Sequence, residues 1–421
     1  MQFSLIINAE YFPTIMIFQF STVNQLKPAI MIKKRWQIIN AISTMIIICC
    51  NGCKSDNTKI FYFDPRQVNE KSVLLSEMAD DISYVCLDDS IPLGNIISMK
   101  ILKNSIYLNS QNIGILKYDR NGILLNRIGN IGKGPGEYLN YLDFCIDEKS
   151  GSVYLRDIGN IIKVYSGTGK FVRSFPIDKV NGIVENINFF SSKLFLQYSI
   201  QYDNCEYEWI FYDTLGQELK KQKRHLQKFT TNYSGRLPSY TLDNKLNYFN
   251  HFTDTTFSIS PNLEEYANLV IKPGDHRLPK KNLPPGQFTS GKYMLLNSII
   301  ETYNFFFINY FYFEPLLVII NKSKNDSQII KVKTKLADNV SGITNDLDGG
   351  IPFIPRYYFV ENSKEFLAAL INPIQIIELT KSVEFNMYPE LTSEKKSKLK
   401  ILSERLKDTD NPVIVMVKLR N

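Results

Sequence analysis

The chain has 421 residues, of which 44% are hydrophobic and 13% aromatic, enough apolar material for a sizeable core. Its 49 basic residues are nearly balanced by 42 acidic ones and form no long basic block, so the sequence does not indicate nucleic-acid binding. The three histidines show neither metal-ligand nor catalytic-triad spacing.

The first 53 residues are predicted to lie outside the folded domain. Lys33–Arg35 form a basic cluster just after Met31, and an apolar stretch of signal-peptide length follows from Ile38 to Cys50. We expect Met31 to be the true start and residues 1–30 to be an upstream extension. The sequence Cys50-Asn-Gly-Cys53 resembles the lipobox of bacterial lipoproteins, although Cys50 stands where leucine is usual. The resemblance implies cleavage before Cys53 and lipid attachment to its thiol, with an uncleaved signal anchor as the alternative.

Residues 54–421 are expected to form a single domain. They retain 45 basic and 41 acidic side chains, so the net charge falls to about +4. Cys86, Cys145 and Cys205 are then an odd number of thiols in or beside strand-like segments. We expect them to be buried and free, with a Cys86–Cys145 disulfide as the alternative.

A short motif recurs at a fixed spacing in the first half of this domain. Tyr118–Gly122, Tyr165–Gly169 and Tyr212–Gly216 each begin with tyrosine and end with glycine, and successive copies are 47 residues apart. Each copy joins two apolar runs, which predicts a strand, a tight turn and a second strand. A fixed period of this length is typical of a repeat architecture.

Weaker copies of the same unit continue to the end of the chain. Apolar runs at 246–249 and 256–259, at 305–308 and 316–320, and at 357–360 and 366–370 raise the number of copies to six. We therefore predict an all-β fold, a six-bladed β-propeller of four-stranded antiparallel blades. A β-sandwich has a similar number of strands but does not require constant spacing, and the rungs of a parallel β-helix are far shorter.

The two ends of the domain are predicted to close the ring. Apolar runs at 59–63 and 82–86 precede the first blade, and Val413–Val417 is a C-terminal strand. An open blade would expose unpaired backbone groups, so we expect N- and C-terminal strands to share the sixth blade. The other expected elements are a further strand of blade six at 376–379 and helices at 293–300 and near 392–407.

Several segments of the domain resemble a known propeller family. Residues 132–138 (Gly-Lys-Gly-Pro-Gly-Glu-Tyr), followed by Phe144–Asp147, Val153–Leu155, Asp157 and Gly169–Phe171, resemble an NHL-type repeat. With Asn345–Gly350, Pro352–Pro355, Asp410–Val413 and Cys53, nearly all of residues 54–421 is similar to six-bladed β-propeller lipoproteins of Bacteroidota. The resemblance implies an exported protein that is lipid-anchored to the cell envelope, at the outer membrane. Tyr141 and Asp143 replace the usual NHL proline and glycine, so no partner of NHL proteins is transferred.

Five residues are candidate ligand-binding positions: Glu137, Tyr138, Arg156, Asp157 and Arg356. The first two end a glycine-rich turn between blades, and such loops gather around the central channel at one face. This turn lacks the Gly-Lys-Ser/Thr sequence that a phosphate loop needs. Each arginine could offer its planar donor fork to a carboxylate or to sugar hydroxyls. The alternatives are packing of the tyrosine between blades and surface ion pairs for the arginines.

Three further polar segments were considered as sites: the acidic stretch at Asp346 and Asp348, the basic stretch that ends at His225, and the segment 272–292. Asp346 and Asp348 resemble part of a calcium loop, but Tyr357 stands where the bidentate glutamate belongs, so an Asx-rich turn is expected. His225 ends the basic stretch 220–225, which we interpret as a solvated loop. The segment 272–292 is rich in Pro, Gly and Lys and is a second candidate surface, with a passive loop as the alternative.

The favoured function is a binding scaffold for an envelope protein or a glycan at the loop face. It requires no cofactor, metal or catalytic residue, and it contacts the membrane only through the lipid. The alternative is a cation-dependent hydrolase or lyase of the six-bladed lactonase type, in which Asp143, Asp157 and Asp346 would converge on the ring axis. A purely structural role in the envelope is a third interpretation.

Overall fold

The structure is a computed structural model that describes residues 58–420, apart from 63, 70, 140–142, 178–179, 181, 200–204, 234, 236, 289, 325, 334–340, 384 and 386–392. Thr58–Asn421 form one compact unit. The predicted signal peptide, the start at Met31 and the lipid-carrying Cys53 lie outside the described residues. Within the described part, no helix is long and apolar enough to cross a membrane.

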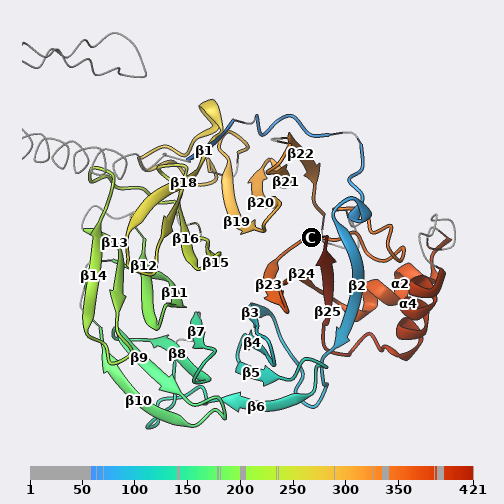
Figure 1. Cartoon of the computed structure of the whole chain (residues 1–421), viewed down its shortest axis with the longest axis horizontal. Helices are drawn as coiled ribbons and strands as arrows, with labels where there is room; N and C mark the ends of the chain where they lie inside the picture. Colours follow the sequence, from blue (N-terminus) through green and yellow to red (C-terminus); the bar gives the residue numbers. More distant parts are fainter. Residues whose placement is uncertain are drawn as a thin grey trace, which may run out of the picture. The chain divides into compact units, whose positions relative to one another are not determined.

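Six small sheets form a ring, which confirms the predicted six-bladed β-propeller (Figure 1). Blade 1 contains β3 (Ile96–Ile101), β4 (Ile106–Ser110), β5 (Gly114–Tyr118) and β6 (Leu124–Ile128). Blade 2 contains β7 (Phe144–Asp147), β8 (Ser152–Asp157), β9 (Ile161–Tyr165) and β10 (Phe171–Pro176). Blade 3 contains β11 (Val184–Phe190), β12 (Lys193–Tyr198), β13 (Tyr207–Tyr212) and β14 (Glu218–Lys223).

The second half of the ring continues the pattern. Blade 4 contains β15 (Ser239–Leu242), β16 (Lys245–Asn250), β17 (Thr255–Ile259) and β18 (Glu265–Lys272). Blade 5 contains β19 (Leu295–Glu301), β20 (Phe305–Tyr312), β21 (Glu314–Asn321) and β22 (Asp326–Lys331). Blade 6 contains β23 (Tyr357–Glu361), β24 (Lys364–Ile371), β25 (Val413–Leu419) and β2 (Ala79–Cys86). The innermost strands are β3, β7, β11, β15, β19 and β23 (Figure 1).

Strands from both ends of the chain close the ring, as predicted. β2 pairs antiparallel with β25, and Ile82 lies opposite Val417. β1 (Lys59–Tyr62) instead adds a fifth strand to blade 4, parallel to β18. Between β1 and β2, Asn69 exchanges two hydrogen bonds with the backbone of Ile329 on the outer strand of blade 5. The N-terminal segment therefore covers the outer edges of blades 4, 5 and 6 in turn.

The hydrophobic core is divided among the junctions between blades. One cluster of buried side chains spans blades 1 and 2, with Ile115 and Val153 among its members. Separate clusters join blades 2 and 3, 3 and 4, 4 and 5, 5 and 6, and 6 and 1. Because each junction buries its own apolar surface, the ring axis is free to be lined by polar groups.

The recurring Tyr-to-Gly motif is the turn between the third and fourth strands of blades 1 to 3. Its tyrosine is buried in each copy. The Asp213 carboxylate accepts the N–H groups of Leu215 and Gln217, which closes the turn of the third copy. Gly169 has a φ of 84°, and its Cα lies against the carbonyl oxygen of Arg127 in blade 1. The motif is therefore also a contact with the preceding blade.

Three expectations about local structure are wrong. The segment 293–300 is the strand β19 rather than a helix, and 376–379 lies in helix α2 (Pro373–Lys381) rather than in a strand. α2 begins with a capping box formed by Asn372 and Gln375, and Pro373 stands in its first turn. Cys86 is exposed, although Cys145 and Cys205 are buried and all three thiols are free. The expected helix near 392–407 is α4 (Ser393–Arg405), and 3-10 turns occupy Leu75–Glu77 and Gly274–His276.

Candidate functional site

A cavity of about 560 Å³ opens at the centre of the ring. All six blades contribute to its wall, at the end where their innermost strands finish and turn into the second strand. Its lining includes the polar side chains of Lys100, Asp147, Asn188, Asp243, Tyr303 and Tyr358. A concave site of this size with a few convergent polar groups is the usual form of a small-ligand site.

Tight turns make the rim of the cavity rigid. Ser191 and Ser192 follow β11, and Asp243 and Asn244 follow β15; all four have positive φ angles between 47° and 59°. Two successive residues with positive φ define the type I′ turn, which fits the twist of the flanking strands. Asp and Asn tolerate this conformation better than most residues. The polar side chains at this rim are therefore held on well-defined backbone.

Two tyrosines form one wall of the cavity. Tyr303, in the turn after β19, is 49% exposed, and Tyr358 on β23 is half-buried. The buried carboxylate of Glu365 accepts the N–H of Tyr303 at 2.7 Å and the hydroxyl of Tyr358 at 2.8 Å. Burial, together with this carboxylate, raises the pKa of Tyr358, so its hydroxyl keeps the donated proton. Glu365 thus ties the tyrosines of blades 5 and 6 together.

Two more carboxylates join neighbouring blades near the axis. Asp143 accepts the N–H groups of Phe144 in blade 2, at 2.9 Å, and of Ile187 in blade 3, at 2.5 Å. Glu301 in blade 5 accepts the hydroxyl of Tyr240 in blade 4, at 2.8 Å, and pairs with Lys322 at 2.6 Å. These acids are occupied by donors of the wall itself.

Glu137 and Tyr138 have structural partners. The Glu137 carboxylate accepts the N–H of Gly134 at 2.8 Å, which closes the glycine-rich turn. Tyr138 is fully buried, and its hydroxyl donates to the carbonyl of Ile128 and accepts the N–H of Ile115. Tyr138 therefore packs between blades 1 and 2, which was the alternative to a binding role.

Arg156, Asp157 and Arg356 lie at the opposite end of the blades from the cavity mouth. Buried Asp157 pairs with Lys163 at 2.7 Å and accepts the N–H of Leu139. Arg356, just before β23, is exposed to solvent, yet burial lowers the pKa of its guanidinium. Water reaches the Arg356 side chain, but nearby protein atoms partly remove its hydration, which accounts for both its exposure and its lowered pKa. A ligand-binding role for these residues stays a prediction.

The acids proposed for a metal site have separate partners. Asp346 accepts the N–H and the hydroxyl of Ser76, and Asp348 accepts the N–H of Gly350 and the hydroxyl of Tyr84. This segment is the expected Asx-rich turn. Among the described residues, no group of three His, Cys, Asp or Glu side chains gathers as metal ligands would.

The segment 272–292 is packed rather than passive. Leu278 and Leu283 enter a small apolar cluster with Tyr233, from the connection between blades 3 and 4. The side chain of Asn232 donates to the carbonyl of Leu283 and accepts its N–H, so the two connections are joined reciprocally. The segment 272–292, the second candidate surface, is therefore held by a small apolar cluster of its own.

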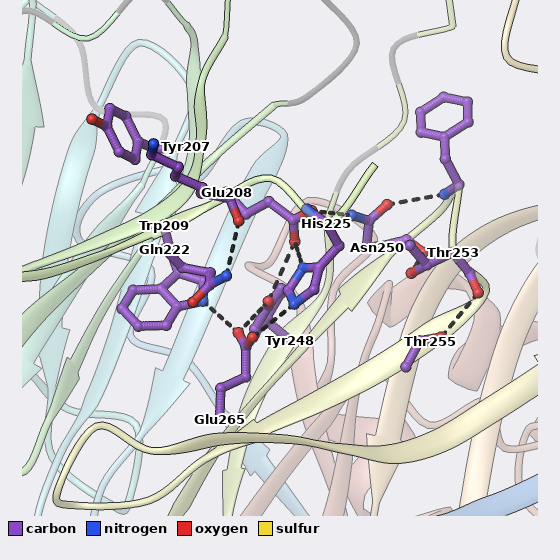
Figure 2. Close-up of polar contacts among 12 residues, drawn as sticks. Tyr207, Glu208, Trp209, Gln222, His225, Tyr248, Asn250, Thr253, Thr255 and Glu265 are labelled. Atoms are coloured by element: carbon purple, nitrogen blue, oxygen red, sulfur yellow. Dashed lines mark hydrogen bonds and ion pairs between the residues drawn. The ribbon is translucent and has the colours of Figure 1, made fainter. Parts of the chain in front are cut away.

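His225 contradicts the prediction of a solvated loop. Its ring lies between the carboxylates of Glu208 and Glu265, at 3.0 and 2.9 Å (Figure 2). The ring also stacks on Phe257, with centroids 4.4 Å apart. Hydrogen bonds to the two carboxylates raise the pKa of His225 to about 10, so the imidazole is charged at neutral pH.

The two carboxylates bring further partners to this cluster, which joins blades 3 and 4. Trp209 donates its indole N–H to Glu265 at 2.7 Å, and Tyr248 donates its hydroxyl at 2.5 Å; Asn250 donates to Glu208 at 3.0 Å. One sequence feature pointed to it: Glu208 interrupts an otherwise apolar strand, and a buried acid requires a partner. The arrangement holds charge in place and offers no open position to a ligand.

The structure is similar to a "Putative exported protein" from Bacteroides fragilis, with a TM-score of 0.61, 15% identity, and 86% of this chain and 100% of the other covered. It is also similar to a member of the DUF4221 family from Bacteroides vulgatus, with a TM-score of 0.47, 9% identity, and 84% and 100% covered. Comparison with curated proteins finds no match.

At 15% identity the Bacteroides fragilis structure shows the fold alone. The sequence itself is more specific, because a family model matches it from residue 58 to residue 418, the whole of the propeller from β1 almost to the end of β25. This chain therefore belongs to the family described as Domain of unknown function (DUF4934).

Proposed function

We propose that this protein is a lipid-anchored binding protein of the cell envelope that takes a glycan in its central cavity. The cavity of about 560 Å³, to which all six blades contribute, carries the proposal. Its volume lies within the range of small-ligand sites, and its mouth is open to solvent. In the described part of the chain, the other polar clusters are occupied by their own partners.

The chemistry of the wall favours a sugar. A sugar ring presents an apolar C–H face and a rim of hydroxyls. Tyr303 and Tyr358 offer aromatic surface, while Asn188, Thr241 and Asp243 offer amide, hydroxyl and carboxylate groups for the rim. Because Asp243 lies in a type I′ turn, its backbone is fixed before binding and little conformational entropy is lost there.

Binding is expected to depend on the aromatic wall. A glycan array identifies the tightest ligand, and titration calorimetry measures its dissociation constant. Tyr303→Ala should weaken binding about tenfold or more, because it removes an aromatic surface worth about 1.4 kcal/mol.

The matched control is Tyr266→Ala, which removes a tyrosine that is 40% exposed on the outer strand β18. It should leave the dissociation constant unchanged. Equal binding by all three proteins would show that the cavity is not the site. If the unmodified protein captures peptides but no glycan, the ligand of the cavity is a protein segment and not a sugar.

The anchoring part of the proposal depends on Cys53. The lipobox-like sequence supports it, and the Bacteroides fragilis neighbour, described as exported, has the same fold. Cys53→Ser should move the protein from the membrane fraction to the soluble fraction and abolish incorporation of labelled fatty acid. The control is Cys86→Ser, which removes an exposed thiol of the propeller. Membrane retention of Cys53→Ser would contradict lipid anchoring.

A further inference from the structure

A second cavity, of about 320 Å³, opens on blade 6. Residues of β2, β25, β24 and the end of β23 form its wall. Asp81 lies opposite Lys418 and Ser83 lies opposite Met416, so these four side chains share one face of the sheet. Met416 belongs to the apolar cluster between blades 6 and 1, so this face looks towards blade 1. The volume is within the range of small-ligand sites.

The second cavity is a direct neighbour of the central one. Val360 lines the central cavity, whereas the next two residues, Glu361 and Asn362, line the second. Because two residues of chain span at most about 7 Å, only the end of β23 separates the two walls. The central cavity opens where the innermost strands turn into the second strands, and the turn between β23 and β24 is one of these turns.

This shared edge has a defined backbone. Asn362 and Ser363 have φ angles of 50° and 60°, and Glu361 pairs with Lys364 across them. Two successive positive φ angles in a two-residue loop are the pattern of a type I′ turn, which also occurs at the rim after β11 and β15. The edge between the two cavities is therefore fixed before a ligand arrives.

Arg120 of blade 1 joins the two walls. Its guanidinium donates to Glu361, in the second cavity, at 3.3 Å, and to the carbonyl of Leu102, in the wall of the central cavity, at 3.4 Å. It also lies over the ring of Phe359, 4.8 Å from the centroid. Its side chain is 20% exposed, so a ligand that passes between blades 6 and 1 can reach it.

The lining of the second cavity offers the same kinds of surface as the central cavity. Half-buried Phe366 and buried Met416 supply apolar surface, while exposed Ser83 and Asn362 supply a hydroxyl and an amide. Two acidic and two basic side chains also line it, so the lining has no net charge that would select an ion: Asp81, Glu361, Lys364 and Lys418. A sugar unit, with its apolar face and its hydroxyls, fits this lining.

We infer that one oligosaccharide occupies both cavities, with one unit in the central cavity and a further unit in the second. This inference rests on the proposed glycan-binding function and specifies the ligand as a chain of several sugars. Tyr303 contacts the unit in the central cavity, and Ser83 and Asn362 contact the unit in the second. Arg120 lies where the sugar chain passes from one cavity to the other.

The test measures by titration calorimetry how affinity depends on the length of the sugar chain. The probes are glucose and two of its tetramers, maltotetraose and cellotetraose, which differ in linkage. The better tetramer should bind about tenfold more tightly than glucose, a gain of about 1.4 kcal/mol. Ser83→Tyr places a ring in the second cavity, so it should remove this gain and leave the affinity for glucose unchanged.

The matched control is Ser174→Tyr, the same substitution on the outer strand β10 of blade 2. Ser174 is also exposed but does not line either cavity. This variant should keep both the affinity for glucose and the gain of the tetramer.

A second measurement on the unmodified sequence shows whether the second cavity is filled. Met416 is buried in its wall, so the NMR signal of its ¹³C-labelled methyl group, assigned with Met416→Leu, should shift with the tetramer but not with glucose. The methyl signal of Met294, which is buried between blades 4 and 5, should shift with neither sugar.

The outcomes separate this inference from the proposed function. Equal affinity for glucose and both tetramers, weakened by Tyr303→Ala, would overturn the second subsite and leave the glycan site of the central cavity intact. A gain that survives Ser83→Tyr without a shift of the Met416 signal would also overturn it, as would a gain lost equally in Ser174→Tyr. Binding of none of the three sugars would overturn both.

Discussion

His225→Ala is expected to lower the free energy of unfolding by about 3–5 kcal/mol, the effect of removing one partner from a buried ion pair. The reason is the environment of Glu208, whose side chain is 2% exposed and faces Glu265 across the imidazolium. Without His225, Glu208 and Glu265 face each other as two like charges. Denaturant unfolding at pH 6 measures the loss.

A pH series shows whether the charge of His225 is responsible. Its pKa rises from about 6.5 when unfolded to about 10 when folded. The stabilisation is therefore complete below pH 6.5 and is lost as the pH rises towards 10. His225→Ala should lack this decline. Glu265→Gln combined with His225→Ala should recover part of the lost stability, because it removes the like charge.

The neighbouring Lys223→Ala is the control for general effects in this stretch, since Lys223 is exposed. It should unfold like the unmodified protein. A His225→Ala variant of unchanged stability, or one with the same decline above pH 6.5, would contradict the assigned role.

Gly169→Ala is expected to lower the free energy of unfolding by about 2–3 kcal/mol. A φ of 84° costs an alanine about 1–2 kcal/mol by itself, and the added Cβ would meet the carbonyl oxygen of Arg127. The Gly169 carbonyl also accepts the N–H of Gly129 at 2.9 Å, so any shift of the turn strains the junction of blades 1 and 2. Thermal and denaturant unfolding both report the change.

Gly159→Ala separates the two causes. Gly159 also has a positive φ, of 83°, but the nearest atom to its Cβ would be a side-chain carbon of Ile161 at 3.8 Å. It should therefore lose only the backbone part of the effect. Equal losses in the two variants would mean that the contact between blades contributes nothing.

Most of the ring could be predicted because the repeat is local in sequence. The spacing of 47 residues comes from a turn whose tyrosine, Asx or Ser side chain and glycine all lie within five residues. Where local patterns compete, prediction failed: Ile376 and Ile377 favour a strand, but the capping box of Asn372 and Gln375 determines a helix. Capping hydrogen bonds stabilise the first turn of the helix. Intrinsic residue propensities do not include this contribution.

The candidate site was harder to predict because its parts meet only when the ring forms. Tyr303 and Lys100 lie some 200 residues apart in the sequence and belong to blades 5 and 1. Each occupies an ordinary turn or strand, and neither stands in a recognisable motif. His225 was missed for a similar reason, since Glu265 lies in the next blade and its approach depends on packing between sheets.

The pairing of β2 with β25 has a consequence for the order in which the chain is made. β2 ends at Cys86, whereas its partner β25 begins only at Val413, so β2 leaves the ribosome long before its partner is made. Until β25 is made, β2 has one strand edge and an apolar face without a native neighbour. Blade 6 can therefore close the ring only after β25 has been made, although β2 precedes the first blade in the sequence.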